Sequence, residues 1–372
     1  MSPKALIVPL SLPALPAQPV VSVLIASYNY GHFIGRTLDS VLAQSYRDFE
    51  VIVCDDGSTD DSREVATRYA GRDARIRLIE KENGGVASAL NRAYQACRGD
   101  VVCLLDADDF FAPEKLERVV ACFQENSEVG LVLHAMQVVD GREQEQGRLP
   151  AHGVCEEGWI AEKVGARGGR WRSMPASALA FRRTVAERLF PVPEATFRSE
   201  ADGFLVMLAP LLTTVGFLPE VLAGYRLHGA NLTAATRLDQ AVVTRSLDAL
   251  HRQNDAVNQR LAHLGVAGEP LALEDHLNYR EQCFMLALFE GERRRTLLRD
   301  YRRLAGALLA DDLYGPLRKA AGLAAYAASI LLPVRTRPAG LTRMLVAPGP
   351  RRLLQNKRSR APTVRDTTER NL

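Results

Sequence analysis

The feature that most constrains the fold is a regular alternation of short apolar segments and helical patterns in the first third of the chain. The apolar segments, rich in β-branched residues, are residues 21–26, 49–54, 76–79 and 101–105. Between them apolar side chains recur at helical spacing, for example at Ile34, Leu38 and Val41. This alternation predicts an α/β fold with a mostly parallel sheet flanked by helices.

Polar and turn-forming residues follow each of the four apolar segments. They read "SYNYGH" (27–32), "DDGSTDDS" (55–62), "KENGG" (81–85) and "DADD" (106–109). Ligands of open α/β sheets bind outside the carboxyl ends of the strands, so we expect the four clusters to meet at one rim. No G-x-G-x-x-G follows the first segment and no P-loop pattern is present, which argues against a dinucleotide oxidoreductase and an ATPase.

The acidic residues of two of these clusters are candidate ligands. Asp106 and Asp108 offer hard oxygen ligands for Mg²⁺ or Mn²⁺; the alternative is a solvated acidic loop, and Asp109 is interpreted as a helix-start acid before Pro113. Asp56 could accept the imide N–H of uracil or thymine, or a sugar hydroxyl; the alternative is a capped turn.

Three later segments add further candidates. In "SEADGFL" (199–205), Glu200 and Asp202 are each either a general base or a helix-capping acid. In "YRLHGAN" (225–231), His228 either binds the metal or diphosphate or is a hydrogen-bonded turn histidine. The segment "RGGRW" (167–171) is interpreted as a loop near the acceptor.

Taken together and in this order, residues 21–62, 83–113, 175–183 and 201–231 resemble the family 2 glycosyltransferases of the GT-A fold. The resemblance covers residues 20–235. It implies a metal-dependent, inverting hexosyltransferase that moves a sugar from a nucleotide-sugar donor to a hydroxyl. The implied setting is the synthesis of a bacterial surface polysaccharide or glycolipid, with a saccharide or lipid-linked acceptor.

The resemblance also implies roles for individual residues. Asp202 is the expected catalytic base; Glu200 is the alternative, because the Glu-Asp pair of many members reads "EAD" here and an ungapped reading places Ala201 at the base position. Asp108 is the expected direct metal ligand, joined by Asp106 and His228. The expected nucleotide-sugar contacts are Ala26, Tyr28, Asp56, Asn83 and Asp106. The imide contact of Asp56 favours a UDP or dTDP donor over GDP.

The predicted domain organisation has four parts. They are an N-terminal extension (1–19), a GT-A catalytic domain (20–235) with a nucleotide-sugar half (20–113) and an acceptor half (114–235), a helical region (236–332) and a basic, partly disordered tail (333–372). Residues 140–170 are polar and Gly-rich and are predicted to form loops.

The net charge of +3 conceals a strongly basic C-terminal region, because residues 318–365 contain many Lys and Arg and no Asp or Glu. Apolar residues alternate with these arginines and no nucleic-acid motif accompanies them. We therefore expect residues 317–360 to contact an anionic membrane surface rather than nucleic acid. No apolar stretch is long enough to span a bilayer, so a cytoplasmic enzyme, peripheral on the inner face of the cell membrane, is expected.

The six cysteines form no C-x-x-C pair and are expected to be reduced thiols rather than zinc ligands or disulfides. Two other functions stay open at this stage. One is a sugar-phosphate nucleotidyltransferase, although "SYNYGH" lacks the Gly-rich basic loop expected of that class. The other is a catalytically inactive nucleotide-sugar-binding scaffold, which the altered Glu-Asp position allows.

Overall fold

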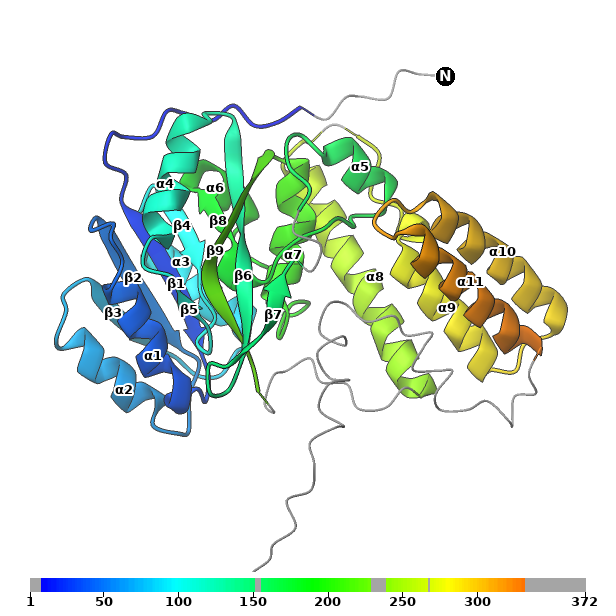
Figure 1. The fold of residues 1–372 in the computed structure, drawn as a ribbon, viewed down its shortest axis with the longest axis horizontal. Helices are drawn as coiled ribbons and strands as arrows, with labels where there is room; N and C mark the ends of the chain where they lie inside the picture. Colours follow the sequence, from blue (N-terminus) through cyan, green and yellow to red (C-terminus); the bar gives the residue numbers. More distant parts are fainter. Residues whose placement is uncertain (1–7, 151–154, 229–238, 267, 332–372) are drawn as a thin grey trace, which may run out of the picture.

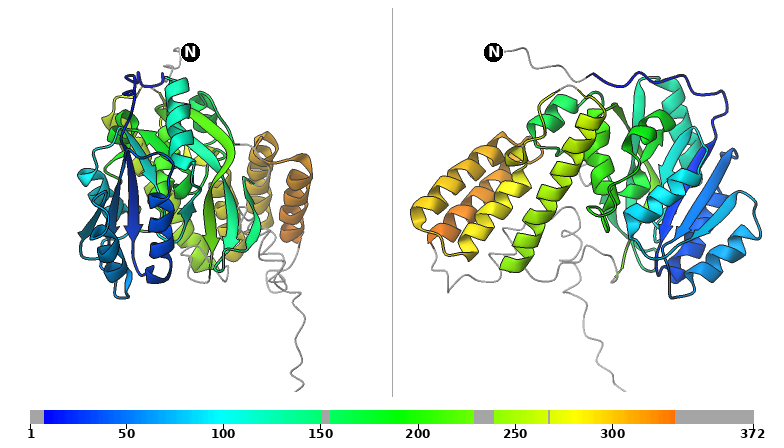
Figure 2. Two further views of the ribbon diagram at one scale, coloured as in Figure 1. Left: turned by 60° about the vertical axis from the view of Figure 1, so that its left-hand side comes forward. Right: turned by 180° about the vertical axis from the view of Figure 1, so that it is seen from behind.

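The computed structural model describes residues 8–150, 155–228, 239–266 and 268–331. Its first part contains the predicted alternation. Four parallel strands, β1 (Val21–Ser27), β2 (Phe49–Asp55), β3 (Ile76–Glu80) and β4 (Val101–Leu104), are separated by α1 (Gly31–Leu42), α2 (Ser62–Ala70) and α3 (Val86–Ala96). Helices α1 and α2 cover one face of the sheet and α3 covers the other (Figures 1 and 2).

The sheet continues with strands from the second half of the GT-A fold. These are β5 (Phe110–Phe111), β6 (Val129–Asp140), β7 (Glu145–Leu149), β8 (Ala180–Arg182) and β9 (Thr214–Leu227). The strand order is β3-β2-β1-β4-β8-β6-β9-β5, with β7 paired to β6. Strand β8 is antiparallel to both β4 and β6, whereas β6 and β9 are parallel. The fold is therefore α/β with a mixed sheet, whose described strands make four parallel and four antiparallel pairings.

The prediction of loops throughout residues 140–170 was wrong at two places within the described residues. Strand β7 pairs with β6 in antiparallel fashion, and α5 spans Ala161–Ala166. The side chains of β7 are mostly polar and exposed, and only Leu149 is buried. An edge strand held by backbone hydrogen bonds lacks the apolar alternation on which the prediction depended.

The remaining helices of the sheet-containing part are α4 (Lys115–Glu125), α6 (Arg183–Leu189) and α7 (Ala201–Leu208). After residue 239 the described chain forms helices, as predicted: α8 (Gln240–His263), α9 (Leu277–Phe289), α10 (Arg294–Ala310) and α11 (Pro316–Leu331). Helices α9–α11 form a bundle beside the sheet, and α8 lies between the two (Figures 1 and 2).

Helix α8 contributes to both hydrophobic cores of the described chain. Its first half, with Val243 and Leu247, packs into the core of the bundle. Its second half, with Val257 and Leu261, packs into the core around the sheet. The boundary predicted at residue 235 and the tail predicted at 333–372 both lie outside the described residues.

The ends of the described chain and its cysteines add three findings. Residues 8–20 run along the sheet-containing part, where the Leu10 amide donates to the Leu212 carbonyl at 2.8 Å. All six cysteines are free thiols in the described chain, and Cys54, Cys97 and Cys103 are buried. Within the described ranges, no helix has both the length and the apolar character needed to cross a membrane.

A lysine is buried beneath the sheet at the start of α4. The side chain of Lys115 is fully buried, and its Nζ lies 3.4 Å from both the centroid of the Phe111 ring and the Ser177 carbonyl oxygen. No carboxylate of the described residues lies within ion-pair distance of it. Burial lowers the pKa of the Lys115 ammonium from 10.5 to about 8. The charged form therefore destabilises the folded protein.

The first prediction concerns this lysine. Because the unfolded chain binds the Lys115 proton more tightly, wild-type stability should rise between about pH 8 and pH 10.5. Lys115→Met lacks that cost, so its free energy of unfolding in urea at pH 7 should exceed the wild-type value by up to about 3 kcal/mol. The difference should shrink towards pH 10. A difference that does not change with pH would contradict the assignment, and the exposed Lys163→Met is the control.

Candidate active site

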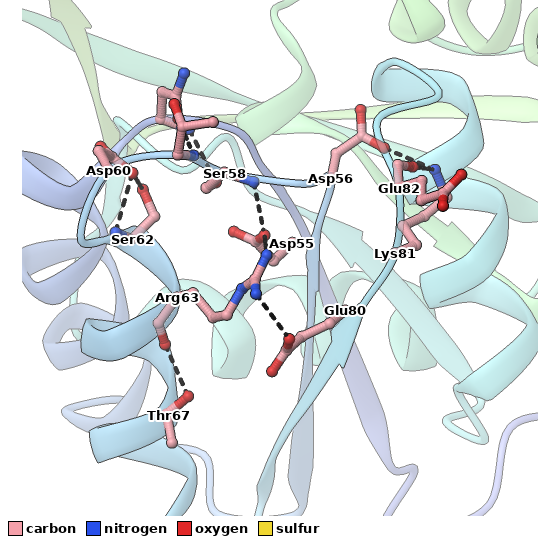
Figure 3. A network of polar contacts seen from close by, with 12 residues as sticks. Asp55, Asp56, Ser58, Asp60, Ser62, Arg63, Thr67, Glu80, Lys81 and Glu82 are labelled. Carbon is pink, nitrogen blue, oxygen red and sulfur yellow. Dashed lines mark hydrogen bonds and ion pairs between the residues drawn. The ribbon is translucent and has the colours of Figure 1, made fainter.

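Asp56, at the carboxyl end of β2, fixes the loop that follows β3. Its Oδ1 accepts hydrogen bonds from Lys81 Nζ at 2.7 Å and from the Gly84 amide at 2.9 Å. Its Oδ2 accepts from the Gly85 amide at 2.7 Å. The side chain is buried, so these charge-assisted bonds hold residues 81–85 against the end of β2 (Figure 3).

Its neighbour Asp55 has a different set of partners. Asp55 Oδ1 accepts from the Ser58 amide at 2.9 Å and lies 3.8 Å from an Arg63 guanidinium nitrogen. Arg63, on α2, also pairs with Glu80 at 3.3 Å (Figure 3). Asp55 therefore joins α2 to the sheet, whereas Asp56 holds the loop after β3. The nucleobase contact of Asp56 stays a prediction.

The loops after β1 and β2 are joined by side-chain hydrogen bonds. Asn29, with a positive φ of 59°, accepts from the Thr59 amide at 2.8 Å, and its own amide donates to Ser58 Oγ at 3.0 Å. These bonds place the end of β1 next to the end of β2. Ala26 is half-buried there, and the Tyr28 side chain is 45% exposed. Both lie at the rim where nucleotide contacts were predicted.

Three carboxylates meet at the carboxyl end of β4. One oxygen from each of Asp106, Asp108 and Asp109 lies within 4.8 Å of the other two. The Asp106 amide donates to Ser177 Oγ at 3.0 Å, and the Asp109 amide donates to the Asp106 carbonyl at 3.0 Å, which closes the turn. Clustered carboxylate oxygens repel each other and suit a divalent cation such as Mg²⁺ or Mn²⁺. The residues present therefore fit the predicted metal.

Asp109 is an interior residue of this cluster, and its prediction as a helix-start acid was wrong. Helix α4 begins only at Lys115, and the fully buried Asp109 carboxylate accepts from Ser177 Oγ at 2.7 Å and from the Arg226 amide at 2.8 Å. Burial, followed by the charges of Asp108 and Asp106, holds the pKa of Asp109 well above its usual range. The two donors come from segments far away in sequence, so no local pattern could identify them.

Polar side chains of α1 and of the segment just after it hold the acidic segment and the residues that follow. Thr37 Oγ1 lies 2.7 Å from the carbonyl oxygen of Asp109. Gln44 Nε2 donates to the Ala112 carbonyl at 2.7 Å, and Gln44 Oε1 accepts from the Leu116 amide at 2.9 Å. Thr37 and Gln44 are fully buried. Thr37 on α1 and Gln44 just after it therefore satisfy buried backbone groups on either side of the short strand β5.

His228, predicted to join the metal site, lies beside it. Its Nε2 is 2.9 Å from Asp108 Oδ2, and its ring stacks on Phe33 with the centroids 4.7 Å apart. Tyr30 lies at the edge of the same ring, with a centroid distance of 6.1 Å. Burial, followed by the charge of Asp108, raises the pKa of Tyr30. The two aromatic side chains form a wall next to the carboxylates that was not foreseen.

Arg226 is a second residue that sequence reasoning missed. Its guanidinium is buried, donates through Nε to the Asp108 carbonyl at 2.7 Å and pairs with Glu143 at 3.1 Å. It also lies over the Phe33 ring, 4.9 Å from the centroid. The arginine thus places a permanent positive charge next to the acidic cluster. It stands two residues before His228, which is the one signal that could have drawn attention to it.

The two base candidates lie at the start of α7. Asp202 is half-buried in the first turn and Glu200 is exposed at the N-cap. Just before them, the Arg198 carbonyl accepts from the Val86 amide at 2.8 Å, and Arg198 Nη2 donates to Asn83 Oδ1 at 2.8 Å. This segment therefore lies against the loop that Asp56 holds.

Gly85 allows the close approach of these two segments. It has a φ of 91°, and a Cβ at this position would lie 2.5 Å from the Arg198 carbonyl oxygen. Asn83, a predicted nucleotide contact, is exposed and bonded to Arg198. The hydrogen bond to Arg198 does not test the predicted role of Asn83 as a nucleotide contact.

The segment 167–171 is a loop, as interpreted, and it contacts both α7 and the helical bundle. Trp171 Nε1 donates to the Val206 carbonyl of α7 at 2.6 Å. Arg170 pairs with Asp311, and the neighbouring Arg172 donates to the Leu313 carbonyl at 3.1 Å. The segment therefore joins α7 to the turn between α10 and α11. Its predicted place near the acceptor is untested.

Comparisons with known proteins identify the family and the fold. The family model described as glycosyl transferase family 2 matches residues 22–190. An uncharacterized glycosyltransferase of Nostoc sp., alr2836, is 35% identical over 263 residues, which is 70% of this chain and 81% of that protein. Chondroitin synthase of Pasteurella multocida is 42% identical over 99 residues, 27% of this chain but only 10% of the synthase.

A solved structure has the same fold. Residues 1–349 of TarS from S. aureus, crystallised in complex with UDP-GlcNAc, superpose with a TM-score of 0.52 at 16% identity, over 84% of this chain and 88% of that one. At this identity the likeness concerns the fold alone.

The second prediction tests the arginine beside the acidic cluster. Arg226→Gln removes the buried counter-charge and leaves the Asp108 carbonyl without this donor, whereas Glu143 keeps its pair with Arg36. The free energy of unfolding, measured in urea, should fall by about 3 kcal/mol. Added Mn²⁺ should restore more stability to this variant than to the wild type, because the cation offsets the carboxylate repulsion.

Arg36→Gln is the matched control for this variant. Arg36 also pairs with Glu143, at 3.2 Å, but it is exposed and no hydrogen bond to the acidic segment accompanies that pair among the described residues. Its loss should cost less than about 1 kcal/mol. Equal destabilisation of the two variants would contradict the role of Arg226.

Proposed function

The chain belongs to the family 2 glycosyltransferases, and from that premise we propose that it is a metal-dependent, inverting hexosyltransferase with a nucleotide-sugar donor. The observation that carries this proposal is the meeting of three carboxylates within 4.8 Å at the end of β4, next to His228. Such a cluster suits the cation that accompanies a diphosphate. Under this proposal Ala26, Tyr28, Asp56, Asn83 and Asp106 bind the nucleotide-sugar.

The proposed reaction is a single displacement. Asp202 accepts the proton of the acceptor hydroxyl while that oxygen forms a bond to the anomeric carbon. The bond from the anomeric carbon to the diphosphate oxygen breaks, and its electron pair leaves with the nucleoside diphosphate. A divalent cation held by Asp106, Asp108 and His228 would offset the negative charge of that leaving group. One protein base then suffices.

We propose a donor with a uracil or thymine base, UDP or dTDP rather than GDP. Support comes from the carboxylate of Asp56, which is an acceptor suited to an imide N–H and lies at the end of β2. In this structure both its oxygens accept from Lys81, Gly84 and Gly85. A nucleobase that donates its imide N–H to Asp56 would therefore share the carboxylate with these donors or replace one of them.

The proposed acceptor is a saccharide or a lipid-linked saccharide in bacterial surface polysaccharide or glycolipid synthesis. Support comes from the relative that makes chondroitin, although this chain spans only a tenth of that synthase. In this proposal residues 20–235 bind donor and acceptor, and the helical region from 236 to 332 follows them. The enzyme would act in the cytoplasm or on the inner face of the cell membrane.

The third prediction tests the base. Asp202→Asn should lower kcat for sugar transfer by about a hundredfold or more while leaving the affinity for the donor within a few-fold, because the base acts on the acceptor proton. Glu200→Gln, two residues away and exposed, should retain most of the activity. The measurement is transfer from a panel of UDP-, dTDP- and GDP-sugars with Mn²⁺.

Three outcomes of this experiment reject parts of the proposal. Loss of activity in Glu200→Gln with retention in Asp202→Asn would make Glu200 the base. Wild-type activity in both variants would show that neither residue of this segment is the catalytic base. If the wild type binds nucleotide-sugars but neither hydrolyses nor transfers them, the inactive scaffold is the better account.

The fourth prediction tests the metal ligand. Asp108→Asn should lose metal-dependent transfer, because the substitution removes a carboxylate charge that would face the cation. Donor binding measured with Mn²⁺ should weaken by about tenfold or more, and binding measured in EDTA should change little. Full metal-dependent activity in this variant would place the metal elsewhere.

A further inference from the structure

The outer face of α10 carries a cluster of exposed arginines. Arg295, Arg299, Arg302 and Arg303 recur at spacings of three, four and seven residues and line a common open hollow with Leu298. Only Arg299 has a carboxylate partner among the described residues, Asp300 at 3.2 Å, and that pair is solvent-exposed. The cluster is therefore a concentrated positive charge with little compensation.

Exposed leucines accompany these arginines. Leu298 and Leu309 are 45% and 58% exposed, and they follow the same helical stripe as Arg295 and Arg302. Leu317, at the start of α11, is 87% exposed. Three of the six large apolar side chains that are exposed in the described chain thus lie on α10 and the first turn of α11. An apolar stripe between arginines has no partner within the described protein.

The position of this face within the bundle adds a second argument. Helices α10 and α11 run in opposite directions, because Tyr301 Oη donates to the Leu323 carbonyl at 3.4 Å and Lys319 Nζ to the Leu309 carbonyl at 2.6 Å. The last turn of α11 therefore lies beside the first turn of α10, at the outer end of the bundle (Figure 1). The sequence that continues from there contains no Asp or Glu before Asp366.

We propose that the exposed face of α10 docks on an anionic lipid surface. Arginines at that surface pair with lipid phosphates, and leucines between them enter the boundary between headgroups and acyl chains. A nucleic acid would satisfy the arginines but offers nothing to the exposed leucines. The face differs from the segment expected from sequence, residues 317–360, because α10 precedes that segment. The proposal does not depend on the identity of the donor.

The test is co-sedimentation of the full chain with lipid vesicles. Wild-type protein should bind vesicles of phosphatidylglycerol and phosphatidylcholine and should bind pure phosphatidylcholine vesicles at least tenfold more weakly, roughly as expected for several arginines near a charged surface. Replacing the four arginines of α10 by glutamine should reduce binding to the anionic vesicles by about tenfold or more. Donor hydrolysis in solution should be unchanged, which shows that the variant is folded.

A matched control carries the same charge change elsewhere. Arg47, Arg68, Arg72 and Arg92 are exposed on the sheet-containing part, and their replacement by glutamine should leave vesicle binding within about twofold of wild type. Equal loss in the two quadruple variants, or wild-type binding by the α10 variant, would overturn the proposal. Leu298→Ser with Leu309→Ser should also weaken vesicle binding. Undiminished binding by that variant would overturn the entry of the leucines into the lipid boundary.

Discussion

The meeting of three carboxylates, two of them buried, at the end of one strand is the constraint on which the rest of the site depends. Asp106, Asp108 and Asp109 lie close enough to repel one another, and Asp108 and Asp109 are withdrawn from water. Ser177 and Arg226 supply donors to them, and α1 holds the backbone around them. The cluster is stable only because segments from four distant parts of the chain meet there.

A second buried carboxylate, that of Asp56, organises another part of the site. One buried carboxylate holds the loop after β3, and that loop in turn contacts the segment that leads to Asp202. Trp171 then fixes α7, and the arginines beside it reach the turn between α10 and α11. A continuous set of contacts therefore runs from the predicted nucleotide site to the helical bundle. Helix α8, shared by both hydrophobic cores, reinforces that connection.

The sequence predicts well the elements whose pattern of apolar side chains reflects their burial. Strands β1, β2 and β4 are largely apolar and buried, and the aspartates after β2 and β4 are placed by the strand before them. Strand β7 was missed because its side chains are mostly polar and exposed, and their pattern gives no sign of its backbone pairing with β6. Asp109 was misassigned and Arg226 was missed for a related reason. Arg226 bonds to Asp108 and Asp109 across more than a hundred positions, and no local spacing reveals such contacts.

The central claim is that the carboxylates after β4 hold the donor diphosphate through a divalent cation. Crystals grown with Mn²⁺ and UDP, with dTDP and GDP as alternatives, allow the cation to be located by its anomalous scattering. The account predicts a single strong peak within about 2.5 Å of carboxylate oxygens of Asp106 or Asp108, with the diphosphate on its other side. A bound nucleotide with no peak at these carboxylates, or with the cation elsewhere, would contradict it.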